Sequence, residues 1–85
     1  MEIEFDPEKE AANLAKHKIS LTRARDLQLL GFRRLERNGE ARLLIVGRLD
    51  GDLYSLILVF RRNAMRAISL RRAHMKEVLD VIQGK

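Results

Sequence analysis

The chain has 85 residues, no cysteine and a net charge of +5, and 46% of its residues are apolar. These values predict one domain over residues 1–85, and they exclude a disulfide-stabilised secreted scaffold, a membrane protein and a large cofactor-binding enzyme. No apolar run approaches the ~18–20 residues of a membrane span, and the acidic N-terminus has the wrong sign for a signal peptide, so we expect a cytoplasmic protein.

The first part of the chain predicts a short strand followed by a helix. Apolar and acidic residues alternate over Met1–Asp6, which is the period of a strand. Asp6 is then a good N-cap and Pro7 a good first helical residue. Cations at positions 16–18 favour a helix end near Lys18, because the C-terminal end of a helix carries a negative partial charge.

The next segment predicts a second helix and a strand. Ser20 is a good N-cap, and Gly31 can terminate a helix. The apolar face of this helix would contain Leu21, Ala24, Leu27 and Leu30. We expect a strand over Phe32–Arg37, followed by the strongest hairpin signal of the chain at Asn38-Gly39.

The second half of the chain predicts a meander of strands and a last helix. Strands are expected at Leu43–Leu49, Leu53–Phe60 and Met65–Leu70, with turns at Asp50–Asp52 and Arg62-Asn63. The nearly continuous apolar run of Leu53–Phe60 belongs in the centre of the sheet, with helices on at least one side. Apolar residues at helical spacing then predict a helix that Gly84 ends; they are Met75, Val78, Leu79 and Ile82.

The predicted fold class is therefore α+β. It has a short N-terminal strand, two helices, an antiparallel meander of three to four strands and a C-terminal helix. We expect both early helices to cover one face of the sheet. At least one face would stay open to solvent or to a partner.

The distribution of charge points to an anionic partner. Residues 1–10 are mainly acidic, whereas residues 61–76 carry arginine and lysine and no acid. Arginine binds phosphate and carboxylate with a planar fork, so RNA or DNA is the first candidate. The alternative is a solvated basic surface that keeps a small domain soluble.

The motifs restrict the chemistry to a few side-chain types. Gly-rich phosphate loops, HExxH and GxSxG are missing from the sequence, and Asp50 and Asp52 are typical turn residues. We therefore expect neither cofactor nor metal. Arginine, lysine, glutamate and histidine suffice for RNA cleavage, because the 2′-hydroxyl of RNA supplies the nucleophile.

The candidate site residues come from three parts of the chain. Arg71-Arg72 is the best phosphate candidate, since it precedes a helix N-terminus; only one of the two can face a given side of a strand. Arg48 lies in an apolar strand, and Lys16-His17 ends the first helix. Glu40 and Glu77 are candidate bases, while His74 is expected to be solvated. Surface charge and helix capping are the competing explanations for these residues.

Two blocks of the sequence resemble the BrnT toxin family. Phe5 and the pattern DPxKxxxNxxKHxIS begin the chain, and ISxRRAxxxE ends at Glu77. Between these blocks the matching positions are Glu40, Arg42, Ile45, Gly47-Arg48 and the apolar strand to Phe60. The resemblance covers nearly the whole chain in order, and the joint occurrence of the two patterns is specific.

The resemblance implies a type II toxin with a RelE-like α+β fold and a ribonuclease activity that halts translation. It also implies a BrnA-type antitoxin encoded beside the toxin, and operator DNA binding by the complex, mainly through the antitoxin. The matching motif positions give the candidate active-site residues Lys16, His17, Arg48, Arg71, Arg72 and Glu77. We assign the arginines to phosphate, His17 or Lys16 to proton transfer, and Glu77 to positioning an arginine or acting as a base.

Two other classes of function remain open. A non-catalytic nucleic-acid-binding module would carry the same charge, and its binding would weaken steeply with salt without cleavage. Few aromatic residues argue against single-strand stacking as its main mode. A protein-interaction domain with an acidic partner is the third hypothesis, and an inactivated toxin would belong to either of these classes.

Overall fold

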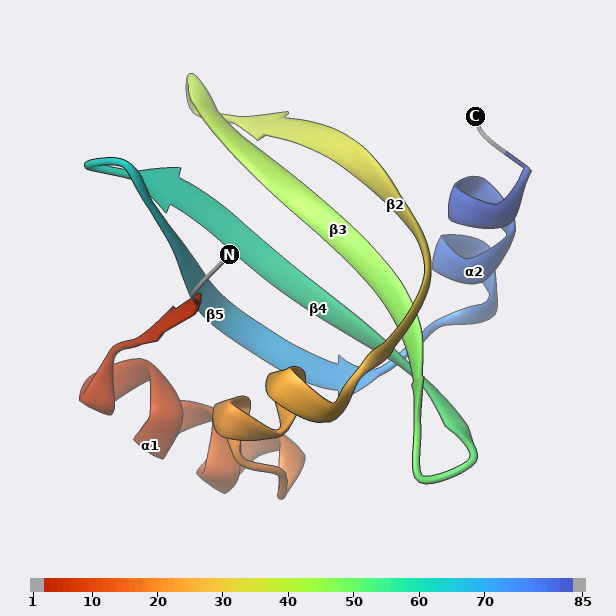
Figure 1. Cartoon of the computed structure of the whole chain (residues 1–85), viewed down its shortest axis with the longest axis horizontal. Helices are drawn as coiled ribbons and strands as arrows, with labels where there is room; N and C mark the ends of the chain where they lie inside the picture. Colours follow the sequence, from red (N-terminus) through yellow and green to blue (C-terminus); the bar gives the residue numbers. More distant parts are fainter. Residues whose placement is uncertain (1–2, 84–85) are drawn as a thin grey trace.

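The computed structural model describes residues 3–83 as one five-stranded sheet with helical segments around it (Figure 1). In chain order the elements are β1 (Ile3–Phe5), α1 (Pro7–His17), η1 (Leu21–Asp26), β2 (Gln28–Arg37), β3 (Glu40–Leu49), β4 (Asp52–Arg61), β5 (Ala64–Arg72) and α2 (Met75–Ile82). The sheet order is β1-β5-β4-β3-β2; β1 is parallel to β5 and the other pairs are antiparallel. The α+β prediction is confirmed, while Met1, Glu2 and the helix end expected at Gly84 lie outside the described residues.

The start of the chain folds as its capping residues predict. The Glu8 N–H donates to Asp6 Oδ1 at 2.8 Å, Pro7 is the first residue of α1, and Lys18 closes the helix in the left-handed conformation at φ 62°. Ser20 is confirmed as an N-cap, because the Thr22 N–H donates to its Oγ at 3.1 Å. The segment that Ser20 begins is a 3-10 helix, however, and it ends at Asp26.

The prediction that Gly31 ends a second helix is wrong. Gly31 lies within β2, which begins at Gln28 and pairs with β3 along its length, with a bulge between Leu29 and Gly31. Pairing with a long neighbouring strand outweighs a weak local helix signal. The glycine is required by packing, because a Cβ there would lie 2.7 Å from Cγ1 of Val81 in α2.

The meander and its hairpin turns are confirmed. Each turn has two residues with positive φ, the conformation that tight hairpins require. These residues are Asn38-Gly39, Asp50-Gly51 and Arg62-Asn63. β4 occupies the middle of the sheet, as its apolar run predicted, and its side chains at Leu56, Leu58 and Val59 are at most 4% exposed.

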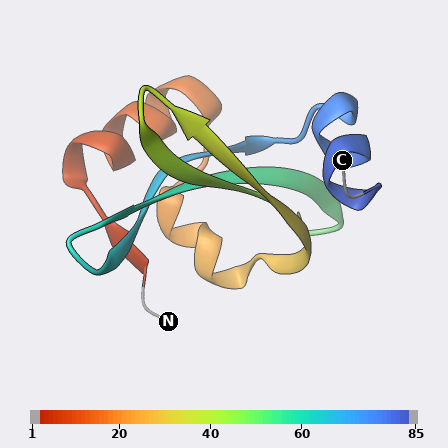
Figure 2. The same cartoon turned by 90° about the horizontal axis from the view of Figure 1, so that it is seen from above.

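Each face of the sheet has its own apolar core. The η1 face is the face where Leu21 and Ala24 of η1 pack on Leu56, Leu58 and other residues of the sheet. The α2 face is the face where Val78 and Val81 pack on Leu44 and Val46. Figure 2 shows η1 and α2 on opposite sides of the strands. Within residues 3–83, no helix is long and apolar enough to span a membrane.

The prediction that both early helices cover one face is wrong for α1. Asn13 is 3% exposed, and its side-chain amide bonds both backbone groups of Leu70, at 2.8 and 3.0 Å. β1 pairs with β5 only as far as Ala67, and beyond it the Asn13 side chain makes the hydrogen bonds that a neighbouring strand would make. These bonds hold α1 along the outer edge of β5. The apolar residues of α1 are all exposed, so the helix buries no apolar side chain on a sheet face; they are Ala11, Ala12, Leu14 and Ala15.

Candidate active site

Arg71 and Glu77 form a bidentate ion pair where β5 meets α2, and we call this pair the clamp. Arg71 donates twice to Glu77, from Nη1 to Oε1 at 2.9 Å and from Nη2 to Oε2 at 2.6 Å. Oε1 also accepts from Ser55 Oγ at 2.8 Å and from the His74 N–H at 3.0 Å. Charge-assisted bonds in this bidentate geometry are among the strongest in proteins. The guanidinium therefore has a fixed position on the α2 face.

The local sequence explains why these groups meet. Arg71 is opposite Ser55 in the β4–β5 register, so their side chains share the α2 face. His74 is the N-cap of α2, and Glu77 is the third residue of the helix, a position from which a carboxylate reaches back to the N-cap N–H. Both ends of the motif ISxRRAxxxE are thus joined by the short turn between β5 and α2.

The environment of Glu77 keeps it ionised. Partial burial by itself would raise its pKa, but the hydrogen bonds from Arg71, the His74 N–H and Ser55 outweigh burial and lower the pKa below its usual value. A carboxylate that already accepts four hydrogen bonds is a weak proton acceptor. Of the two roles assigned to Glu77, the geometry favours positioning Arg71 over acting as a base.

His17 ends α1 within range of the charge of this arginine. Asn13 anchors α1 at Leu70, the residue before Arg71, and His17 follows Asn13 by about one helical turn. Burial, Lys16 and Arg71 all lower the pKa of His17. The lowered pKa favours the neutral imidazole, which is able to accept a proton. Lys16, at the same helix end, is exposed.

The two adjacent arginines of β5 point to opposite faces. Arg72 lies on the η1 face, with Cζ 5.8 Å from the centroid of the Tyr54 ring and Nη2 3.4 Å from Asp52 Oδ1. The alternation of side chains along a strand produces this divergence. Arg71 alone of the pair therefore takes part in the cluster with Glu77 and Ser55.

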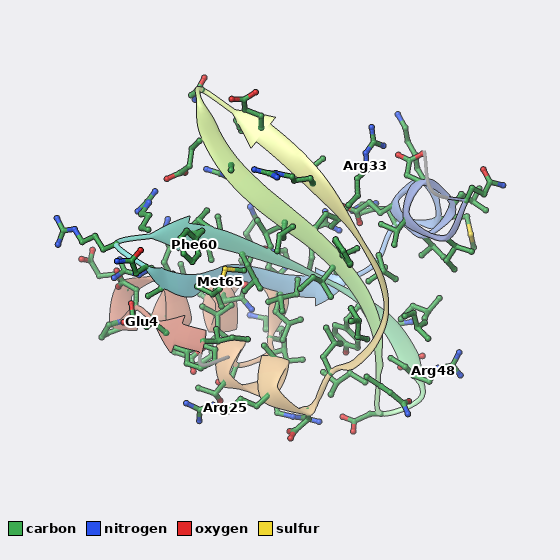
Figure 3. All side chains as sticks on the ribbon, turned by 45° about the horizontal axis from the view of Figure 1, so that its top comes forward. Glu4, Arg25, Arg33, Arg48, Phe60 and Met65 are labelled. Carbon is green, nitrogen blue, oxygen red and sulfur yellow. The ribbon has the colours of Figure 1, made fainter. Side chains whose placement is uncertain are left out.

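Arg48 is on the α2 face, on β3, which is two strands from the β5 strand that carries Arg71. It is exposed, and Figure 3 shows it near the β3–β4 hairpin. Its register partner is Leu53, whose carbonyl accepts from the Ala73 N–H at 3.0 Å. Leu53 of β4 and Ala73, just past the end of β5, thus lie in the same row of the sheet as Arg48. The next row on this face contains Ser55 and Arg71.

Glu40 belongs to a different ion-pair cluster. Arg61 Nε donates to it at 2.6 Å and Arg42 Nη2 lies 3.5 Å away, and the Arg61 hydrogen bond is the main cause of its lowered pKa. Arg42 is opposite Val59, four residues along β4 from Ser55. The structure therefore does not bring Glu40 to the clamp, and the side chain of His74 is exposed, as expected.

Sequence reasoning missed Ser55 as a functional candidate. Ser55 is 1% exposed, in the middle of the apolar run of β4. A hydroxyl buried among apolar residues needs a partner, and this was the available signal. Within the part of the chain that the structure describes, His, Asp and Glu do not gather in groups of three or more that could hold a metal ion.

This arrangement defines a small basic α+β protein with a fixed guanidinium at the end of one sheet strand and a histidine of lowered pKa at the end of α1. The chain belongs to the BrnT family: the family profile described as "Ribonuclease toxin, BrnT, of type II toxin-antitoxin system" matches residues 5–77. All six candidate residues lie inside this match, and the sequence-based identification of the family is confirmed.

A solved structure supports the same assignment. The fold is similar to the crystal structure of the Brucella abortus ribonuclease toxin BrnT, with a TM-score of 0.67 and 25% sequence identity over 87% of this chain and 97% of that chain. Comparison with curated proteins gives no match.

Proposed function

We propose that this BrnT-family chain is an endoribonuclease that cleaves RNA without a metal ion, at the site formed by Arg71, Glu77 and His17. The observation that carries this proposal is the fixed guanidinium of Arg71, together with a histidine whose pKa is lowered by burial and by the charges of Lys16 and Arg71. One group stabilises negative charge without giving up a proton, and the other is ready to accept one.

In the proposed reaction the ribose 2′-oxygen attacks the adjacent phosphorus. His17 takes the 2′-hydroxyl proton as the new O2′–P bond forms. The P–O5′ bond breaks, and the leaving 5′-oxygen takes a proton from Lys16 or from water. The products are a 2′,3′-cyclic phosphate and a 5′-hydroxyl. No redox change occurs, and no group outside the RNA, the protein and water is required.

Arg71 has the capacity to bind the phosphate in this reaction. Its hydrogen bonds to Glu77 and to the Arg72 carbonyl, at 3.1 Å from Nη1, use three of the five N–H groups of a guanidinium. The other two are available for the charge that develops on the phosphate oxygens. Because Glu77 holds the fork in place, little reorganisation is needed as the transition state forms.

The remaining candidate cations would contact the RNA on either side of the cleaved bond. Arg48 shares the α2 face with Arg71 and would bind a flanking phosphate. Arg72, on the η1 face beside Tyr54, would contact a segment of RNA that passes the sheet edge. We assign both residues to substrate binding, and we keep the cleavage step for Arg71 and His17.

The cellular role follows from the family. We propose that cleavage halts translation in the cytoplasm and that a BrnA-type antitoxin encoded beside this gene neutralises the protein. Operator DNA would be bound only by the toxin–antitoxin complex. A RelE-like relationship of the fold is part of the same proposal, since the mixed sheet and its helices are compatible with it.

Tightly controlled expression tests the proposed function. Wild-type protein should arrest growth and fragment total RNA, and Arg71→Ala at equal soluble expression should do neither. Arg62→Ala is a matched control, because Arg62 is an exposed turn residue and its loss should leave growth arrest unchanged. Intact RNA and normal growth with soluble wild type would contradict the proposal and favour the non-catalytic binding module.

A further inference from the structure

An apolar groove lies on the η1 face, at the end of the sheet that η1 leaves uncovered. Its volume is about 430 Å³. It is lined by Phe32, Arg34, Ala41, Arg42, Leu43, Leu58, Phe60 and Met65. Figure 3 shows Phe60 and Met65 together on neighbouring strands, well separated from Arg48.

The groove exposes aromatic side chains over core residues. Phe32 is 61% exposed and Phe60 54% exposed, while Leu58 and Met65, which also line the groove, are nearly fully buried and belong to the main core. Scattered exposed apolar residues are ordinary, but a hollow lined by several of them, with arginine at its rim, is typical of an interaction site.

The groove is separate from the candidate active site. Phe60 and Met65 face each other across β4 and β5 on the η1 face. Arg71 and Glu77 meet on the α2 face, on the other side of the same strands. A ligand seated in the groove would therefore not touch the Arg71–Glu77 clamp.

The charge around the groove selects an acidic occupant. Arg34 lines it, and Arg62 follows Phe60 closely in the β4–β5 turn. Among residues 3–83, neither of these arginines has an ion-pair partner. Side chains alternate along β2, so Glu36 lies on the same η1 face as Arg34, and it is an exposed carboxylate there. The chain as a whole carries +5, so complementary charge would also accelerate association.

We propose that this groove anchors an acidic, amphipathic segment of the antitoxin, with apolar side chains between Phe32 and Phe60 and carboxylates at Arg34 and Arg62. The proposal rests on the toxin–antitoxin pairing given above as part of the proposed function. A second copy of this chain fits less well, because it would bring two basic rims together. Anchoring on the η1 face makes antitoxin affinity separable from RNA cleavage on the α2 face.

The test measures the affinity of the purified antitoxin, the product of the adjacent reading frame, for variants of the purified toxin. Phe60→Glu should weaken the equilibrium Kd by about 30-fold or more, as expected for an aromatic anchor at the centre of an interface. Leu14→Glu is the matched control, because Leu14 is 46% exposed on α1, away from the groove; its Kd should match that of the wild type.

Two further readouts keep the outcomes distinct. Phe60→Glu should still cleave RNA like the wild type, and it should arrest growth even when the antitoxin is co-expressed. Arg34→Ala should slow association severalfold, and this effect should shrink at high salt. If Phe60→Glu does not fold, Phe60→Ala and Phe32→Ala replace it with the same expectation.

Three results would overturn the proposal. One is wild-type antitoxin affinity in the Phe60 and Phe32 variants. Another is a wild-type protein that sediments as a dimer, together with a Phe60→Glu variant that sediments as a monomer and binds the antitoxin unchanged. That result would make a second copy of this chain the occupant of the groove. The third is a Phe60 or Phe32 variant that loses RNA binding but binds the antitoxin like the wild type. If the wild type cleaves no RNA, the proposed ribonuclease function fails. The affinities of the variants still show whether the antitoxin binds in the groove.

Discussion

Replacing Glu77 by glutamine separates its positioning role from a role as a base. The glutamine would keep an oxygen for Ser55 and His74 but would present an NH₂ group to Arg71 Nη2, so the 2.6 Å charge-assisted bond is lost. The side chains of Arg71 and Glu77 are less than a third exposed, at 25% and 19%. A hydrogen bond to a charged group contributes ~1.5–3 kcal/mol. For a domain of this size we expect Tm to fall by about 6–24 °C at pH 7.

The pH dependence of this loss has a definite sign. The pKa of Glu77 in the folded protein lies below its usual value of 4.5. Its contribution to the free energy of unfolding is therefore present above the unfolded-state pKa and is lost as pH falls through the folded-state pKa. Thermal unfolding followed by circular dichroism should show a large Tm difference between wild type and Glu77→Gln at pH 7, shrinking as pH falls below 4.5.

The control for this series is Glu36→Gln, which neutralises an exposed carboxylate and should leave Tm nearly unchanged. Glu77→Gln should also slow RNA cleavage, while the rise in rate with pH should persist, because that rise belongs to His17. A Tm difference that is the same at pH 3 and pH 7, or none at pH 7, would refute the account of Glu77. Loss of the pH-dependent rise would make Glu77 the base.

The remaining predictions concern three positions. Arg71→Ala should lower kcat for RNA cleavage about 10²–10³-fold, whereas Arg72→Ala should mainly raise KM; equal kcat losses would contradict the divergence of the two side chains. The cleavage rate of wild type should rise with pH to a half-maximum below the ordinary histidine pKa of 6.5, and His17→Ala should abolish this rise; an unchanged profile would remove His17 as the base. Asn13→Ala leaves the backbone groups of Leu70 without their partners, so each should cost ~1–3 kcal/mol in thermal unfolding; an unchanged Tm would show that another group closes this edge.

Local signals predicted the local features of this fold. Asp6-Pro7 begins a helix, and Asn38-Gly39 and Arg62-Asn63 form turns, because each depends on residues within a few positions. β2 was underestimated because its pairing with β3 and its contact with Val81 join distant parts of the chain. The residues next to Gly31 in the sequence carry no information about α2, which packs against Gly31 but lies at the other end of the chain.

The candidate site was predictable to the extent that its residues share a motif. Arg71 and Glu77 are six residues apart, so a strand-to-helix turn brings them together. Ser55 was not predictable as their partner, because its place depends on the register of β4 against β5. The place of Arg48 on β3, two strands from Arg71, depends on strand register in the same way. The position of His17 relative to Arg71 depends on a long-range contact, because Asn13 of α1 bonds to Leu70, a residue fifty-seven positions away.

The most direct test of the central claim is cleavage of a defined RNA oligonucleotide by the purified protein in the presence of EDTA, with the product ends identified by mass spectrometry. We expect wild type to produce 2′,3′-cyclic phosphate and 5′-hydroxyl ends, Arg71→Ala to be nearly inactive, and a fully 2′-O-methylated oligonucleotide to remain intact. Cleavage of the 2′-O-methylated strand, full activity of Arg71→Ala, or intact RNA with folded wild type would contradict the account.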